Sequence, residues 1–510
     1  MIEIKGKGNE TIKVNTQVFI NNEWSDGVNG NSKKEKFQLI NPATEEVMGE
    51  YFLGDSTDVD TAVKAARNAY NSKWKSMNPS DRGILLYKLA DLIEKHRHVL
   101  AVLESVNVGK PYGESYYYDL KQTINTYRYF AGWADKLQGN SIPIGHMSAN
   151  APTFALTRHV PLGVVGLILP WNLPLQLLTW KLAPCLATGN TVVIKPSEFT
   201  PLTTWYLANL IKEAGFPPGV VNVIAGNGVQ VGNAISSHMD INKVGFTGST
   251  KIGKLVQVSA TNSNLKHVSL ELGGKSPVIV FSDTKNPSET TTQSLFEKAI
   301  VDSYHGLFWN AGQCCSAGSR IYVQEQVYDE FVQRMHTMVK NRVLGDPLDS
   351  KTDQGPQVNK FQMESVLRYC QIGQNEGARL VCGGKRHGTK GYYIEPTIFA
   401  DVQDHMTIAR EEIFGPVMCI FKFKTISEVI ERANNSIYGL VGSVFTRDFN
   451  TSLVVSEQLD VGLVWVNSFN IIDATIPWGG TKQSGIGRDL SQYCLNQYTE
   501  TKSIILHSNL

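Results

Sequence analysis

The sequence carries almost no excess of charge of either sign. Its 48 Lys and Arg residues face 47 Asp and Glu residues, so the formal net charge is +1 over 510 residues. A balance this even supplies no bulk field that would attract nucleic acid or an anionic membrane. We therefore expect neither as a partner, and we expect any charged ligand to be bound by local groups.

Cysteine is scarce, since the chain has only seven such residues. An odd and sparse count argues against a disulfide framework and favours reduced thiols in the cytoplasm. No cysteine stands with histidines at the spacing of a zinc site. The sequence therefore predicts no metal site.

A long apolar run is also missing. The most apolar stretch, 161–187, is interrupted by Pro170, Asn172 and Lys181 among others, which excludes a membrane span. The first residues, MIEIKGKGNETIKV, have neither the apolar core of a signal peptide nor an Arg-rich amphipathic pattern. With 42% hydrophobic residues the composition is that of an ordinary globular enzyme, for which we expect a cytoplasmic location.

The chain does contain a regular alternation of strand and helix patterns. Asp55 offers a cap for one helix, and Pro79 begins a second. Beyond 161, short runs rich in β-branched residues alternate with helical patterns such as 203–214 and 250–260; the runs are 164–169, 191–194, 220–224, 243–246 and 277–281. This alternation predicts an α/β protein with a mostly parallel, doubly wound sheet.

The polar, proline-containing stretch 282–292 is the best boundary between two α/β units. We expect 1–138 and 161–283 to form the first unit, and 284–495 to form the second. The segments 139–160 and 496–510 fit neither unit, and each contains a strand pattern, at 153–159 and 502–507. These two strands are expected to pair as a protruding sheet between subunits.

Two patterns contain groups that suit covalent chemistry. Cys314 and Cys315 lie among small residues, including Gly312 and Gly318, that let the backbone turn tightly and a ligand approach. A thiolate there is a strong nucleophile, although a lone cysteine is more often a small core residue. Glu271 follows a strand pattern and precedes two glycines. Burial there would raise its pKa and suit it to general base catalysis; a surface carboxylate is the alternative.

Three further segments follow strand patterns of the first unit. Gly248 and Ser249 stand between a strand and a helix, where main-chain N–H groups can bind phosphate, although the spacing is not the GxGxxG dinucleotide fingerprint. Lys195 and Glu198 end another strand pattern, and 170–172 (PWN) end a third. Ligands of open α/β sheets bind at the carboxyl ends of strands, so we expect these segments to face one crevice.

Together these motifs resemble those of the aldehyde dehydrogenase family, most closely its cytosolic class 1 and mitochondrial class 2, retinal dehydrogenase-like, NAD-dependent branch. The resemblance runs from about residue 18 to 508 and rests on PWN (170–172), IKPSE (194–198), AGFPPGVVNVI (214–224), FTGST (246–250), LELGGKS (270–276), FxxxGQxCxA (308–317) and EEIFGPV (411–417). It implies the aldehyde dehydrogenase fold, with a Rossmann-like NAD-binding domain in the first unit, an α/β catalytic domain in the second and a small β oligomerisation flap. It also implies a homo-oligomer, a tetramer or a dimer.

The resemblance implies oxidation of an aldehyde to a carboxylic acid, with roles assigned by motif position. Cys315 rather than Cys314 matches the nucleophile that carries the thiohemiacetal and the thioester. Asn172 matches the side-chain donor of the oxyanion hole, and Glu271 the general base that hydrolyses the thioester. The presence of Glu271 favours hydrolysis over acyl transfer to coenzyme A.

A larger set of residues matches cofactor-binding positions: Leu169, Pro170, Trp171, Lys195, Ser197, Glu198, Gly228, Gly248, Ser249, Leu272, Gln362, Glu412 and Phe414. Lys195 and Glu198 match the pair that holds the adenosine ribose. A carboxylate at the ribose 2′-hydroxyl would repel the extra phosphate of NADP, so NAD is favoured as the cofactor over NADP.

The positions that match the substrate tunnel are Leu173, Trp180, Ser316, Phe469 and Trp478. Most are apolar, which fits an uncharged aliphatic, aromatic or retinal-like aldehyde better than a phosphorylated or dicarboxylic one. Leu173 replaces a common Phe and would widen the entrance, whereas Trp478 would narrow another wall. The sequence leaves the aldehyde open.

The chain departs from the class 1 and class 2 pattern in three places. Extra residues lie near 284–293 and near 146–152, and Asp489 stands where the family usually has Glu. Two alternatives to the main prediction stay open: a specialised betaine-aldehyde or semialdehyde dehydrogenase, and a non-catalytic structural descendant.

Overall fold

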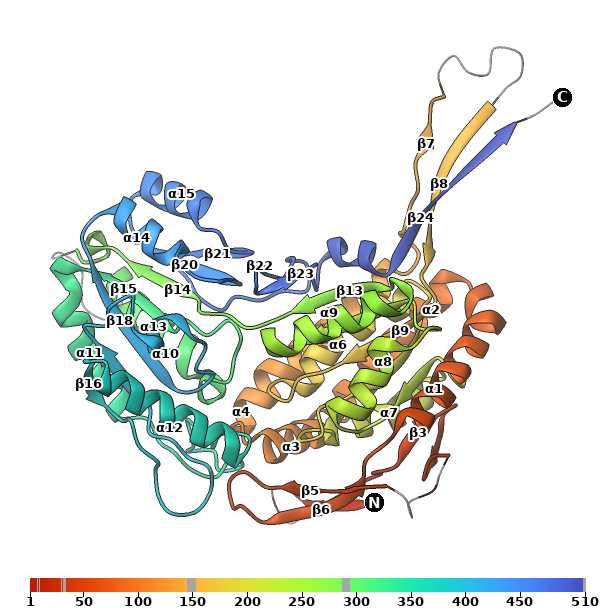
Figure 1. The fold of residues 1–510 in the computed structure, drawn as a ribbon, viewed down its shortest axis with the longest axis horizontal. Helices are drawn as coiled ribbons and strands as arrows, with labels where there is room; N and C mark the ends of the chain where they lie inside the picture. Colours follow the sequence, from red (N-terminus) through yellow and green to blue (C-terminus); the bar gives the residue numbers. More distant parts are fainter. Residues whose placement is uncertain are drawn as a thin grey trace.

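Two α/β units lie side by side, and a long three-stranded arm projects from one of them (Figure 1). The computed structural model describes residues 1–6, 8, 10–28, 30, 34–144, 153–286 and 294–507. Within these ranges no helix is both long and apolar enough to cross a membrane. The extra residues expected near 146–152, and most of those near 284–293, lie outside the described residues.

The first unit is built on an eight-stranded sheet of order β23-β13-β12-β9-β10-β11-β3-β4. Its parallel strands are β9 (Val164–Ile168), β10 (Thr191–Lys195), β11 (Val221–Val223), β12 (Lys243–Thr247) and β13 (His267–Glu271). The antiparallel edge strands are β3 (Val18–Ile20), β4 (Glu23–Ser25) and β23 (Gly485–Ile486). β9 and β10 are buried along their whole length, as expected for parallel strands with covered faces. The strands predicted between 164 and 246 are confirmed, as is their parallel sheet.

Helices α1, α6, α7 and α9 pack directly against the strands of this sheet. The helices of this part of the chain are α1 (Ser56–Ala69), α2 (Pro79–Lys95), α3 (Arg97–Val108), α4 (Tyr112–Glu114), α5 (Leu120–Trp133), α6 (Pro174–Ala187), α7 (Leu202–Ala214), α8 (Asn233–Ser237) and α9 (Thr250–Asn264). The Asp55 side chain accepts hydrogen bonds from the main-chain N–H groups of Thr57 and Asp58, which confirms the predicted cap. Two hairpins, β1 (Ile2–Lys5) with β2 (Thr11–Val14) and β5 (Lys36–Ile40) with β6 (Val47–Phe52), complete the N-terminal part.

The second unit contains a seven-stranded sheet of order β16-β17-β18-β15-β14-β20-β21. Its strands are β14 (Pro277–Val280), β15 (Arg320–Gln324), β16 (Arg379–Cys382), β17 (Thr397–Ala400), β18 (Val417–Phe423), β20 (Val441–Phe445) and β21 (Leu463–Val466); β19 (Tyr438–Gly439) pairs with β22 (Thr481–Lys482) outside it. The helices of this unit are α10 (Leu295–Phe308), α11 (Tyr328–Lys340), α12 (Lys360–Asn375), α13 (Thr407–Arg410), α14 (Ile426–Asn434) and α15 (Phe449–Gln458).

One predicted strand lies in the other sheet. The run 277–281 was expected in the first unit, but β14 pairs with β15 and β20 in the second sheet. The chain therefore crosses between the sheets in the segment 272–276, before the expected boundary at 282–292. A short, fully buried run of Val and Ile suits the interior of either parallel sheet, and both partners of β14 follow it in the sequence.

The arm consists of β24 (Thr499–His507), β8 (Thr153–Pro161) and β7 (Ser141–Ile142), in that order. β8 and β24 run antiparallel over nine residues each, with Thr499 opposite Pro161 and His507 opposite Thr153. The predicted pairing of these two distant strands is confirmed. In Figure 1 they extend well beyond both units.

Candidate active site

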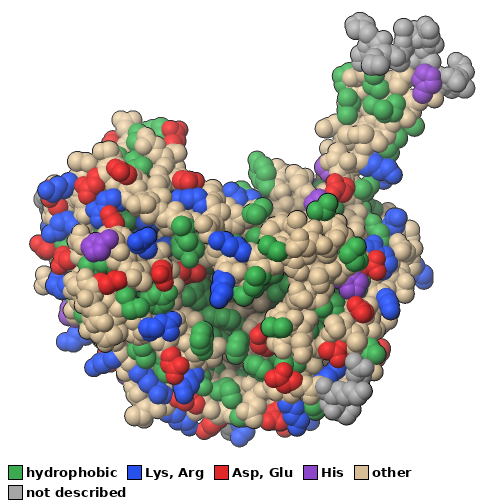
Figure 2. All heavy atoms as spheres, viewed as in Figure 1, with side chains coloured by type: hydrophobic (Ala, Val, Ile, Leu, Met, Phe, Trp, Pro, Cys, Tyr) green, Lys and Arg blue, Asp and Glu red, His purple; other side chains and the backbone are tan. Residues whose placement is uncertain are grey.

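A cleft of about 200 Å³ lies where the second unit meets the carboxyl ends of β9, β12 and β13. Its lining residues are Pro170, Trp171, Asn172, Leu177, Thr247, Gly248, Ser249, Glu271, Leu272, Gly273, Cys315, Gln362, Glu412 and Phe414. Figure 2 shows a hollow with hydrophobic side chains near the centre of the face that it presents. All three predicted catalytic residues line the cleft, together with most of the predicted cofactor residues.

Five predicted cofactor residues are not in this lining: Leu169, Lys195, Ser197, Glu198 and Gly228. The Lys195 ammonium nitrogen lies 3.1 Å from Oε2 of Glu198. The main-chain N–H of Leu169 donates to the main-chain oxygen of Lys195 at 3.0 Å. The ion pair therefore lies at the end of β10, beside the end of β9 from which the cleft begins.

The two adjacent thiols have different surroundings. Cys315 lines the cleft, whereas Cys314 is buried with its Sγ 3.2 Å from Oγ of Ser316. The hydrogen bond between the thiols raises the pKa of Cys315, and burial and the carboxylates of Glu412 and Glu271 raise it further. The same bond lowers the pKa of Cys314. Cys315 is nevertheless the thiol that a ligand in the cleft can reach.

Glycines let the cysteine loop of the second unit approach the end of β13. A Cβ atom on Gly274 would lie 2.3 Å from the main-chain oxygen of Cys315. Gly312 has a φ of +74°, and a Cβ there would lie 2.1 Å from the main-chain oxygen of Gly415. A side chain at either position would clash with these main-chain atoms and displace the cysteine loop.

Asn172 is tied to the cysteine loop through both its side chain and its main chain. Its Nδ2 donates to the main-chain oxygen of Gln313 at 3.0 Å. Nδ2 of Asn310 donates to the main-chain oxygen of Asn172, also at 3.0 Å. An amide nitrogen carries two N–H groups, so Asn172 keeps a second donor that can stabilise negative charge beside Cys315.

Glu271, at the end of β13, is buried. Burial raises the pKa of its carboxyl group well above the ordinary value, the Asp489 carboxylate raises it further, and Lys181 and Arg488 oppose the rise. Nζ of Lys181 and Oδ2 of Asp489 form a buried ion pair at 2.5 Å. A carboxyl group with a raised pKa in the same cleft as a thiol suits general base catalysis.

Residues of the second unit contact one another and the first unit along the cleft. Oε1 of Glu412 accepts a hydrogen bond from the main-chain N–H of Gly274 at 3.0 Å, and burial raises the pKa of Glu412 to about 7. Gln362, in the first turn of α12, donates from Nε2 to the main-chain oxygen of Phe414 at 2.8 Å. The Phe414 ring meets the ring of Trp171 edge to face, with centroids 5.2 Å apart.

The opposite wall has features that suit a phosphate-bearing ligand. Gly248 and Ser249 line the cleft immediately before α9, so the positive end of the helix dipole lies there. Thr247, at the end of β12, has a buried hydroxyl with no hydrogen-bond partner among the described residues. Such a hydroxyl is available to form a hydrogen bond with a ligand bound in the cleft.

The predicted tunnel residues do not line this cleft. All five are buried: Leu173, Trp180, Ser316, Phe469 and Trp478. The rings of Trp180 and Trp478 have centroids 5.3 Å apart, and Trp465 links Trp478 to Phe469. Leu173, Trp180, Phe469 and Trp478 belong to one apolar cluster, which does not include Ser316, and the role of the five residues as a tunnel stays a prediction.

All seven cysteines are free thiols. Of the five cysteines outside the Cys314–Cys315 pair, four are buried, as expected of small core residues, namely Cys185, Cys370, Cys419 and Cys494; Cys382 was expected there too but is only half-buried. Among the residues that the structure describes, no three His, Cys, Asp or Glu side chains gather in a way that could hold a metal ion.

The model of the aldehyde dehydrogenase family matches residues 28–504. The chain belongs to the aldehyde dehydrogenase family. It is 53% identical over 490 residues to the mitochondrial aldehyde dehydrogenase of Rattus norvegicus, covering 96% of this chain and 91% of that protein. It is 52% identical over 491 residues to aldehyde dehydrogenase 1A1 of Homo sapiens, covering 96% and 94%.

Solved structures of the family have the same fold. The NAD+ complex of aldehyde dehydrogenase from Bacillus cereus matches with a TM-score of 0.91 and 46% identity, over 96% of each chain. Betaine aldehyde dehydrogenase from Staphylococcus aureus in complex with NAD+ matches with a TM-score of 0.92 and 39% identity, over 98% of this chain and 96% of that chain. The implied aldehyde dehydrogenase fold is confirmed. The protein is an oxidoreductase of the aldehyde dehydrogenase class, and its relatives support dependence on NAD or NADP.

Sequence reasoning missed three residues that line the cleft: Leu177, Thr247 and Gly273. Thr247 and Gly273 lie inside the family motifs FTGST and LELGGKS, so reading each motif residue by residue would have found them. Leu177 lies in the first turn of α6, four residues after Leu173, which is the N-cap of that helix. Helical spacing was the available signal for this residue.

Proposed function

We propose that the protein oxidises an uncharged aldehyde to a carboxylic acid, with NAD+ as electron acceptor and Cys315 as covalent carrier. The observation that supports this reading is the convergence of Cys315, Asn172 and Glu271 on one cleft. A nucleophile, an oxyanion donor and a base are the three groups that such a reaction needs. The first unit would bind the cofactor, and the second would supply the thiol.

The reaction begins with addition of the Cys315 thiolate to the carbonyl carbon. A C–S bond forms, the π electrons move to oxygen, and the thiol proton leaves through water. The side-chain N–H of Asn172 and the main-chain N–H of Cys315 donate to that oxygen. Because the charge develops only during this step, these donors lower its barrier rather than tighten substrate binding.

Bound NAD+ supplies an acceptor for the hydride that leaves the aldehyde carbon. Glu412 and Phe414 of the second unit and Trp171 of the first would hold its nicotinamide end. Gly248, Ser249 and the unpartnered Thr247 hydroxyl fit its phosphates. Loss of the hydride restores the carbonyl and leaves a thioester on Cys315.

Glu271 acts in the second half of the reaction. Its carboxylate takes a proton from water as the water oxygen attacks the thioester carbon. The C–S bond breaks, Cys315 leaves as thiolate, and a carboxylic acid is released. Burial of Glu271 supports this role, because a raised pKa makes a carboxylate a stronger base.

Glu198 is the basis for proposing NAD rather than NADP. Its carboxylate, paired with Lys195, would accept a hydrogen bond from the ribose 2′-hydroxyl and repel a 2′-phosphate. The apolar cluster of Trp180, Phe469 and Trp478 supports an uncharged aldehyde as substrate. We further propose a homo-oligomer in contact through the arm, and a cytoplasmic location, where free thiols persist.

The test is turnover by the wild-type protein and by Cys315→Ala. NADH formation is measured with acetaldehyde, hexanal, benzaldehyde, retinal and betaine aldehyde, and each rate is repeated with NADP. We expect activity with uncharged aldehydes and NAD+, none in Cys315→Ala, and unchanged NAD+ binding by that variant. Activity that survives in Cys315→Ala would contradict the assignment of the nucleophile. Preference for betaine aldehyde would favour the specialised reading, and no turnover at all would favour a non-catalytic protein.

A further inference from the structure

The turn that precedes the two cysteines has an unfavourable backbone. Asn310 and Ala311 have φ values of 49° and 52°, and Gly312 continues in the same region at 74°. Residues with a Cβ atom rarely occupy this left-handed region. Such a turn persists only where surrounding contacts determine it, and such turns cluster at functional sites.

One of those contacts comes from the first half of the chain. Oε2 of Glu114, the last residue of α4, accepts a hydrogen bond from the main-chain N–H of Asn310 at 3.0 Å. α4 is itself fixed to the second unit, because the main-chain N–H of Tyr112 donates to the main-chain oxygen of Pro347 at 2.8 Å. The carboxylate also lies near the cations of Arg342 and Lys110. Glu114 therefore holds the Asn310 backbone from across the junction between the units.

The Asn310 side chain carries this constraint to the oxyanion donor. Its Nδ2 donates to the main-chain oxygens of Asn172 and Gln313, at 3.0 and 3.2 Å. The Asn172 side chain donates to the same Gln313 oxygen at 3.0 Å. Asn172 and the residue just before the cysteine pair thus share one hydrogen-bonded junction, and Asn310 is its centre.

We propose that Glu114 is a positioning residue for the oxyanion site formed by Asn172 and the main chain of Cys315. It acts through Asn310: its carboxylate fixes the left-handed turn, and the turn fixes the distance between the Asn172 amide and the thiol. This inference rests on the proposed thioester mechanism. Glu114 does not line the cleft that would hold substrate and cofactor, so its removal is expected to alter the rate of thiol addition without altering cofactor binding.

Three substitutions of Glu114 distinguish the effect of its hydrogen bond to Asn310 from the effect of its negative charge. Glu114→Ala removes the acceptor and is expected to lower kcat by about 10- to 100-fold, since a misplacement of about 1 Å at an active site has effects of that size. Glu114→Gln keeps an oxygen at the same reach and is expected to stay within about threefold of wild type. Glu114→Asp keeps the charge but shortens the side chain, so its kcat is expected to fall toward that of Glu114→Ala. The KM for NAD+ is expected to stay unchanged in all three.

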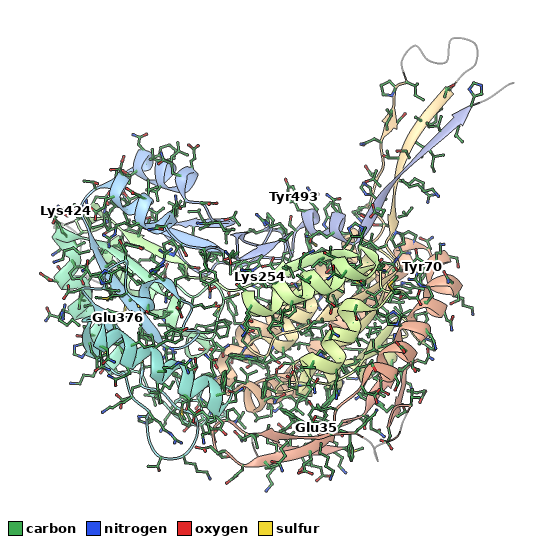
Figure 3. All side chains as sticks on the ribbon, viewed as in Figure 1. Glu35, Tyr70, Lys254, Glu376, Lys424 and Tyr493 are labelled. Atoms are coloured by element: carbon green, nitrogen blue, oxygen red, sulfur yellow. The ribbon has the colours of Figure 1, made fainter. Side chains whose placement is uncertain are left out.

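Glu376→Ala is the matched control. Oε2 of Glu376 also accepts a hydrogen bond from a main-chain N–H, that of Thr407 at 2.7 Å. Glu376 follows the last turn of α12, whereas Gln362 in the first turn lines the cleft, and Figure 3 labels Glu376 on the second unit. Its removal is expected to leave kcat unchanged.

The decisive readings are kcat, the two KM values and the thermal midpoint of each variant. Loss of kcat in Glu114→Ala and Glu114→Asp with recovery in Glu114→Gln supports the proposal, whatever the change in midpoint. A wild-type kcat in Glu114→Asp together with a reduced kcat in Glu114→Gln would show that the charge of Glu114 matters rather than its hydrogen bond. That result would overturn the proposal. If Glu114→Ala does not fold, the Gln and Asp variants still decide. Failure of the thioester mechanism itself is recognised separately, as activity retained in Cys315→Ala.

Discussion

Among single residues, Glu271, the proposed general base, is expected to contribute a pH dependence of its own to thioester hydrolysis. A general base acts only when deprotonated, and burial together with Asp489 keeps the Glu271 proton bound at pH values where an ordinary carboxyl group has lost it. We therefore expect the steady-state rate to rise as pH increases through the raised pKa of Glu271, and to level off above it. Measuring kcat with NAD+ from acidic to alkaline pH checks this.

Glu271→Gln is the control for that pH profile. The variant can still form the thioester, but it has no base for hydrolysis. Its steady-state rate is expected to fall by about 10²- to 10⁴-fold, while a burst of about one NADH per active site remains. A Glu271→Gln variant that kept the wild-type steady-state rate would contradict the assignment.

At the same scale, residue types were predictable from the sequence, but several of their contacts were not. Cys315 and Glu271 lie in motifs specific enough to be assigned by position. The bond from Asn310 to Glu114 joins residues 196 positions apart, and neither has a sequence neighbour that signals the other. Such a contact depends on how the two units meet, which no local pattern encodes.

At the scale of elements, the local sequence pattern predicts where strands and helices lie. It does not always predict which sheet a strand joins. Apolar runs gave β9, β10 and β12, and helical spacing gave α7 and α9. β14 was assigned to the wrong sheet because its Val–Ile run would suit either interior. Pairing depends on the tertiary neighbours of a strand, whereas a run of apolar residues reports only burial.

A buried ion pair joins α6 to the C-terminal segment. The side chains of Lys181 and Asp489 are 0% and 4% exposed, so removal of one partner leaves an uncompensated buried charge. Asp489→Ala is expected to lower the free energy of unfolding by about 3–5 kcal/mol, as measured by urea denaturation. The double variant Lys181→Met with Asp489→Leu is expected to recover most of that loss, because two apolar groups can fill the same space. A double variant less stable than Asp489→Ala would show that packing, not charge, dominates there.

Across the whole molecule, the active site exists only because two separate sheets meet. Cys315, the proposed nucleophile, and Glu412 come from the second unit, whereas Asn172, Glu271 and the residues before α9 come from the first. β23, which follows the second sheet in the chain, returns to pair with β13 at the edge of the first sheet. This return crosses the junction beside Glu271, which pairs with Gly485, and so links the relative position of the units to the position of the Glu271 carboxylate.

The arm carries exposed apolar side chains that a second protein molecule could cover. Phe154 and Leu506 face each other in register across β8 and β24, yet they are 50% and 53% exposed. Apolar side chains gathered on a projecting sheet indicate a protein contact, and a second copy of this chain is the occupant that we propose. Phe154→Lys with Leu506→Glu replaces both by opposite charges that still pair across the strands, so the arm itself is kept. The variant is expected to form a smaller assembly than wild type by light scattering.

The control for this prediction is Phe449→Lys, which charges an equally apolar side chain, 75% exposed on α15 and remote from the arm (Figure 1). It is expected to leave the mass unchanged, because exposure alone does not make a contact. An unchanged mass in the arm variant, with its thermal midpoint also unchanged, would mean that no second copy covers these strands. A reduced mass in both variants would mean that added charge, rather than position on the arm, breaks the assembly.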